Sequence, residues 1–114
     1  MGTEKNLKCV IDIFVRGRKQ YASIIFISQS YFGVPTEVRT NCDYFIFTRG
    51  LRGNELIQIA KDQSSSVSKD KFKELYSRAT QEGYNFLLVD SQTTNPAMRY
   101  RRKFNFSLLT NKLI

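Results

Sequence analysis

The residues with the clearest capacity for chemistry lie between positions 16 and 30. The apolar run SIIFIS ends at Gln29, and the segment RGRK, residues 16–19, places three cations shortly before it. A carboxamide at the end of a buried strand can hold a water molecule or a phosphoryl oxygen, and arginines suit the charge that develops in phosphoryl transfer. Gln29, Arg18 and Arg16 are therefore candidate catalytic residues for nucleotide hydrolysis.

Both features also have simpler interpretations. A strand-end glutamine can cap the backbone groups of the following loop. Lysine and arginine are enriched near helix C-termini, where the helix dipole favours cations. The residue pattern alone leaves these alternatives open.

Several kinds of chemistry are excluded by what the sequence lacks. It contains no GxxxxGK[ST] loop, and no apolar strand ends in a pair of acids that could hold Mg²⁺, so we do not expect this chain to bind ATP by itself. It contains no histidine, which removes the Ser-His and Cys-His nucleophiles and the usual metal sites. Asp90 ends an apolar run alone, and its position before SQTTNP favours a turn former.

The apolar pattern predicts alternating helices and strands. Leu7, Val10, Ile11 and Phe14 have helical spacing, and residues 22–28 read as a central strand covered on both faces. Further along, we expect strands at 44–47 and 85–89 and a short helix at 55–60. Ser68 should cap another helix, with an apolar stripe at Phe72, Leu75, Tyr76 and Ala79 and an end at Gly83.

The segment MRYRRKFNF predicts a basic strand. If it is extended throughout, Arg99, Arg101 and Lys103 point to one side, and Tyr100, Phe104 and Phe106 point to the core. With 18 Lys and Arg against 10 Asp and Glu, the net charge of +8 favours an anionic partner. The candidate DNA-binding residues are those of this strand and of the turn TRGLRG: Arg99, Arg101, Arg102, Lys103, Arg49 and Arg52. The alternative is a solvated edge strand whose charges prevent aggregation.

Length and composition fit a single α/β domain over residues 1–114, with residues 99–114 as a basic strand and C-terminal tail. No apolar run reaches the roughly 18 residues of a membrane span, and the polar start MGTEKNLK does not resemble a secretory signal. Cys9 and Cys42 are isolated from each other in sequence, which favours buried thiols in a reducing compartment. We therefore expect an intracellular protein that is not secreted.

Beyond these patterns, a longer stretch has a family likeness. VRGRKQYASIIFISQSYFGVPTEVRTNCDYFIF, continued by NELIQIA and GYNFLLVD, resembles the genome-packaging ATPases of poxviruses, iridoviruses and virophages, which belong to the FtsK–HerA superfamily. The resemblance covers residues 7–106. Its most specific part is the RGR-to-SQS block followed by the proline and arginine of VPTEVR.

The resemblance implies a fold and roles for particular residues. It implies part of a P-loop NTPase (RecA/FtsK-like) sheet with flanking helices, without the Walker A and Walker B strands, which would lie upstream of Leu7. Gln29 matches the sensor that faces the γ-phosphate, while Arg18, and after it Arg16, matches a candidate arginine finger acting across a subunit boundary. ATP and Mg²⁺ would be the cofactors. The partners would be double-stranded DNA and either a Walker-containing N-terminal half or other subunits of a homo-oligomeric ring, in the host cytoplasm, a viral factory or the virion.

Three functional hypotheses follow. The first is a fragment or subunit of a viral DNA-packaging motor, without ATPase activity alone. The second is a small non-enzymatic DNA-binding module built on the basic strand and the turn TRGLRG. The third is an inactive relic. The sequence does not distinguish a relic from a truncated or a split gene.

Overall fold

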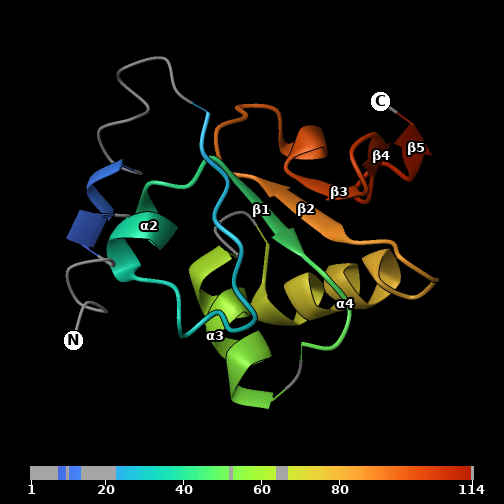
Figure 1. Ribbon diagram of the computed structural model, residues 1–114. Coiled ribbons are helices and arrows are strands. Elements are labelled where there is room, and N and C mark those ends of the chain that lie inside the picture. The colour runs from blue at the N-terminus through green and yellow to red at the C-terminus, as the bar shows by residue number, and fades with distance from the viewer. Residues whose placement is uncertain (1–7, 10, 14–22, 52, 64–66, 114) are drawn as a thin grey trace. The chain divides into compact units, whose positions relative to one another are not determined.

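The computed structural model describes residues 8–9, 11–13, 23–51, 53–63 and 67–113 (Figure 1). The chain divides into two compact units, Met1–Cys42 and Asp43–Ile114. Tyr31 and Val38 are buried in the first unit, and most of the other buried apolar side chains belong to the second. The division into two compact units does not decide whether the chain is one domain, so a single domain over residues 1–114 stays a prediction.

The second unit is built on a five-stranded sheet. Its strands are β1 (Tyr44–Phe47), β2 (Leu87–Asp90), β3 (Tyr100–Arg102), β4 (Phe106–Ser107) and β5 (Lys112–Leu113). They lie in the order β1-β2-β3-β4-β5, and every neighbouring pair is antiparallel. The α/β class is therefore confirmed, whereas an antiparallel sheet does not by itself confirm the P-loop NTPase sheet that the resemblance implies.

Two helices connect β1 to β2 and pack on the sheet. They are α3 (Gly53–Gln63) and α4 (Lys69–Ala79), which contact each other, and α4 also contacts β2 and β3 (Figure 1). Phe72 of α4 meets Tyr100 of β3 edge to face, with ring centroids 6.0 Å apart. The core of this unit consists of Phe47, Ile59, Ala60, Phe72, Leu75, Tyr76, Ala79, Leu87, Leu88, Val89, Tyr100 and Leu108.

The predicted helix start at Ser68 is confirmed. The Ser68 side chain accepts a hydrogen bond from the Lys71 amide at 3.1 Å, which satisfies one of the free donors of the first turn. The expected stripe is buried, as predicted. The expected end at Gly83 is wrong, because the helix ends at Ala79 and the Thr80 hydroxyl bonds back to the Tyr76 carbonyl at 2.9 Å.

The first unit contains one helix with defined bounds, α2 (Thr36–Thr40), within its described residues. It follows a turn in which the Val34 amide donates to the Tyr31 carbonyl at 3.1 Å. The Arg39 guanidinium lies 5.0 Å from the centre of the Tyr31 ring. Residues 8, 9 and 11–13 are helical, in agreement with the predicted first helix, while Leu7, Val10 and Phe14 lie outside the described residues.

The predicted central strand at residues 22–28 is wrong over its described part. Residues 23–28 form no strand, and Ile25 and Ile27 are 87% and 89% exposed. An apolar, β-branched sequence favours a strand only when a neighbouring strand pairs with its backbone groups and covers its side chains. Within the described residues of this unit, no such strand is found.

The predicted single basic strand is also corrected. β3 ends at Arg102, residues 103–105 form a turn, and β4 returns beside β3, with Arg102 opposite Phe106. Lys103 has a φ of 58°, a left-handed conformation that reverses the chain. The expected division into a cationic face and a core-seeking face therefore fails beyond Arg102, and Phe104 is exposed.

Candidate nucleic-acid interface

Two connections between a strand and a helix and one hairpin turn lie at the same end of the sheet. Because β1, β2, β3 and β4 are antiparallel neighbours, the end of β1, the start of β2 and the turn between β3 and β4 lie at the same end. These connections carry Arg49, Tyr84 and the pair Lys103–Phe104, and Arg102 is the last residue of β3. We call the set Arg49, Tyr84, Arg102, Lys103 and Phe104 the cationic end.

Arg49 lies in a turn that is held by a buried tyrosine. The Tyr76 hydroxyl donates to the Thr48 carbonyl at 2.7 Å and accepts from the Leu51 amide at 2.9 Å, so it joins both sides of the turn. Gly50 has a φ of 105°, which glycine adopts without strain. The Arg49 guanidinium donates to the Gln81 carbonyl at 3.5 Å, which places this cation beside the loop before β2.

Arg102 and Lys103 present two cations at the hairpin between β3 and β4. The Arg102 guanidinium carbon lies 4.2 Å from the centre of the Phe106 ring, and this contact fixes its orientation. The Lys103 amide donates to the Phe86 carbonyl at 3.0 Å, which ties the hairpin turn to the loop before β2. The Lys103 side chain is exposed.

Two aromatic side chains are exposed among these cations. Tyr84 is fully exposed, in a turn closed by a hydrogen bond of 3.1 Å from the Asn85 amide to the Glu82 carbonyl. Phe104 is 63% exposed, and its ring meets the Phe86 ring edge to face at 5.1 Å. Exposed aromatic rings beside cations are the groups on which nucleic-acid bases stack.

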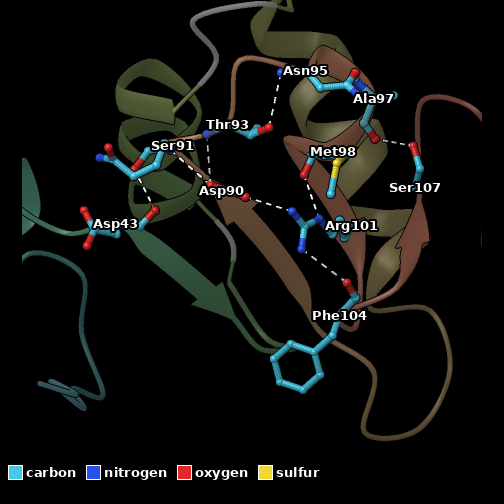
Figure 2. A network of polar contacts seen from close by, with 11 residues as sticks. Asp43, Asp90, Ser91, Thr93, Asn95, Ala97, Met98, Arg101, Phe104 and Ser107 are labelled. Carbon is cyan, nitrogen blue, oxygen red and sulfur yellow. Dashed lines mark hydrogen bonds and ion pairs between the residues drawn. The ribbon is translucent and has the colours of Figure 1, made fainter. Parts of the chain in front are cut away.

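Arg101 is placed differently from its neighbours. Its Nη2 lies 2.7 Å from Asp90 Oδ2, and only 13% of the Arg101 side chain is exposed. Its Nε donates to the Met98 carbonyl at 2.7 Å and its Nη1 to the Phe104 carbonyl at 3.3 Å (Figure 2). The guanidinium therefore joins the end of β2, the 3-10 turn Pro96–Met98 before β3 and the hairpin turn, and it is not part of the exposed cationic end.

Asp90 is the centre of this polar network, and its predicted role as a turn former is confirmed. Its Oδ1 accepts hydrogen bonds from the amides of Gln92 and Thr93 at 3.0 and 3.1 Å. Its other oxygen binds Arg101, as Figure 2 shows. The Ser91 hydroxyl donates to the Asp43 carbonyl at 2.7 Å and fixes the start of β1 beside the end of β2.

The other predicted DNA-binding residues lie elsewhere or outside the described residues. Arg99 precedes β3 at the opposite end of the sheet, where its carbonyl accepts from the Asp90 amide at 2.8 Å. Arg52 lies outside the described residues. The structure thus brings together Arg49, Arg102 and Lys103 from the predicted set.

Gln29 is exposed, but it does not end a strand. It lies in a bend between two serines, in which the Ser28 hydroxyl donates to the Ser30 carbonyl at 2.8 Å and accepts from the Ser30 amide at 3.2 Å. The predicted position at a strand end is therefore wrong, because residues 23–28 are not paired as a strand. Arg16 and Arg18 lie outside the described residues, so their predicted role stays a prediction.

The sequence analysis does not name Tyr84 and Phe104, the two exposed aromatic residues of the cationic end, as candidate site residues. Tyr84 follows Gly83, which has a φ of 50°; the glycine indicates a turn, but nothing in the sequence indicates that the tyrosine ring is exposed. The alternation in MRYRRKFNF predicts Phe104 as a core residue only if the whole segment is one strand, and the turn at residues 103–105 removes that condition. Within the described ranges, no group of three or more His, Cys, Asp or Glu is placed to hold a metal ion.

In the parts of the chain that the structure describes, no helix has the length and apolar character needed to cross a membrane. No family model, curated protein or solved structure matches this chain.

Proposed function

We propose that this chain is the DNA-contacting component of a packaging-type motor, whose nucleotide is bound by another polypeptide. The observation that supports this most directly is the cationic end, where Arg49 and the adjacent pair Arg102–Lys103 come from two distant parts of the sequence to one end of the sheet. Such a surface on a chain of net charge +8 suits the phosphate backbone of DNA.

The proposal places the sheet of Asp43–Ile114 at the periphery of a P-loop NTPase fold. Antiparallel strands are common at the edge of sheets that are otherwise parallel, so this sheet is compatible with such a position. The Walker A and Walker B strands, ATP and Mg²⁺ belong to the other polypeptide. The exposed apolar segment at residues 23–28 becomes a strand when a strand of that polypeptide pairs with it, and this pairing places Gln29 at a strand end.

DNA binding through the cationic end is tested by neutralising one cation at a time. Arg49→Gln, Arg102→Gln and Lys103→Gln should each weaken duplex binding. Each should also reduce the slope of log K against log salt by about 0.9, because one fewer counterion is released per lost phosphate contact. Fluorescence anisotropy with a labelled duplex, measured over a salt series, gives both quantities.

Lys69→Gln provides the matched control. Lys69 is an exposed cation at the first residue of α4, about 15 Å along the helix from the end that leads to the loop before β2. It should leave the slope unchanged. If all three variants of the cationic end behave like Lys69→Gln, DNA does not bind there and the proposal is wrong.

The second candidate function is an autonomous, non-enzymatic DNA-binding module. The observation in its favour is that Asp43–Ile114 contains its own sheet, helices and buried core. The two candidates agree on DNA binding and differ in whether a Walker-containing partner exists. ATPase complementation with a Walker-containing half separates them, because only a motor component should restore hydrolysis.

A further inference from the structure

The cationic end carries more aromatic surface than phosphate binding requires. Tyr84 is fully exposed and Phe104 is 63% exposed, although both have large apolar rings that would gain from burial. They come from two neighbouring loops that are joined by the Lys103–Phe86 backbone bond of 3.0 Å and by the Phe86–Phe104 ring contact. Figure 2 shows the Phe104 ring turned away from the buried network around Arg101.

We propose that the cationic end binds single-stranded nucleic acid, with bases stacked on the rings of Tyr84 and Phe104. Arg49, Arg102 and Lys103 would contact the phosphates on either side of the stacked bases. The inference rests on the proposed function, because it uses the same cations, and it names an unpaired strand as the tighter ligand, with a duplex bound through its phosphates alone.

The arrangement favours an unpaired strand for two reasons. The bases of a duplex are already stacked on one another, so exposed rings gain no base contact without unstacking them. The cationic end also lies in short connections, and among the residues that the structure describes no element longer than the short β3–β4 hairpin extends from it toward a major groove. Aromatic rings interleaved with cations are the arrangement by which single strands are bound without sequence preference.

The contact between Phe86 and Phe104 makes one of the two rings a firm platform. The two rings are edge to face, with an interplanar angle of 71°, so the Phe86 ring supports the Phe104 ring and leaves part of its surface exposed. Arg102 is likewise held against Phe106. A side chain that is already held loses less conformational freedom when a base binds.

The test measures the affinity of the full chain for a fluorescent oligothymidylate. Tyr84→Leu and Phe104→Leu keep an apolar side chain but remove the ring, and each should weaken binding by about 5- to 150-fold. Tyr84→Phe keeps the ring and should bind within about 2-fold of the unaltered chain. Tyr44→Leu is the matched control, because Tyr44 is also exposed but lies at the opposite end of β1.

Two competitors identify the ligand class. An unlabelled duplex of the same length should compete at least about 10-fold more weakly than the single strand, since its bases are not available to the rings. Anionic phospholipid vesicles should also compete more weakly than the single strand, because they offer negative charge to the cations but no bases to the rings.

The outcomes separate this inference from the proposed function. If the leucine variants bind the single strand as well as the unaltered chain while the cation variants do not, stacking is absent and the proposed function stands. If the duplex or the vesicles compete as well as the single strand, the ligand class is wrong. If neither the ring variants nor the cation variants change binding, both proposals fail.

Discussion

At the residue scale, Lys103 combines an unfavourable backbone conformation with a position at the cationic end. Its φ of 58° lies in the left-handed region, which costs a residue with a Cβ about 1–2 kcal/mol relative to glycine. We therefore expect Lys103→Gly to raise the free energy of unfolding by about 0.5–1 kcal/mol after the greater freedom of glycine in the unfolded chain is deducted. The same variant should weaken DNA binding, because it removes a cation.

Denaturant titration and DNA anisotropy on the same preparation check both halves of this prediction. Asn111→Gly is a useful comparison, because Asn111 also has a positive φ, of 56°, and carries no charge. Asn111→Gly should change the free energy of unfolding without weakening the binding of DNA. A Lys103→Gly variant that binds DNA as the unaltered chain does would contradict the role of Lys103.

At this scale, the sequence predicted the cations of the interface better than its aromatic residues. Arg49, Arg102 and Lys103 were identifiable because charge clusters are visible in the sequence itself. Phe104 was not, because its orientation depends on the chain reversal at Lys103, and a positive φ at a lysine has no sequence signal. Arg101 shows the converse. Its charge suggests DNA binding, but its guanidinium forms a largely buried ion pair with Asp90 at the end of β2.

At the scale of elements, the exposed apolar segment at residues 23–28 has consequences for association. Ile25 and Ile27 are largely exposed, and exposed apolar side chains promote association between chains. The double variant Ile25→Lys, Ile27→Lys should reduce concentration-dependent association of the isolated chain. Its free energy of unfolding should change by less than about 0.5 kcal/mol, because neither side chain is buried.

Sedimentation velocity over a concentration series measures this association. Ile13→Lys is the control, because Ile13 is a helical residue that is 57% exposed. Association that persists in the double variant but not in the control would show that residues 23–28 are not the associating segment.

The elements that the sequence predicted correctly are those whose signals are local. The Ser68 cap, the stripe of α4 and the strands β1 and β2 each follow from a few neighbouring residues. The segment at 23–28 has an equally strong apolar signal, but a strand needs a neighbour, and local sequence does not supply one. For the same reason, the division of the basic segment into β3 and β4 was missed.

At the scale of the whole molecule, the remaining question is whether the chain acts with a partner or alone. An autonomous module needs only the unit Asp43–Ile114, which holds the cationic end and most of the core. A motor component also needs the exposed segment that ends at Gln29. The first 42 residues are therefore the part of the chain on which the two candidate functions differ.

ATPase complementation tests that difference. The chain alone should neither bind a labelled ATP analogue saturably nor hydrolyse ATP, because its sequence has no Walker A loop. If the proposed function is correct, mixing the chain with the Walker-containing N-terminal half of a genome-packaging ATPase of the kind that the sequence resembles should restore hydrolysis. Gln29→Ala should abolish that activity, and Ile25→Lys, Ile27→Lys should prevent it by blocking strand pairing.

Gln92→Ala is the matched control in this experiment. Gln92 is another exposed glutamine, in the turn that follows β2, and its replacement should leave the restored hydrolysis unchanged. Hydrolysis by the chain alone would refute the division of the motor between two polypeptides. If the mixture stays inactive while DNA binding through the cationic end is intact, the autonomous module becomes the better account, because DNA binding is then not accompanied by ATP hydrolysis with a Walker-containing half.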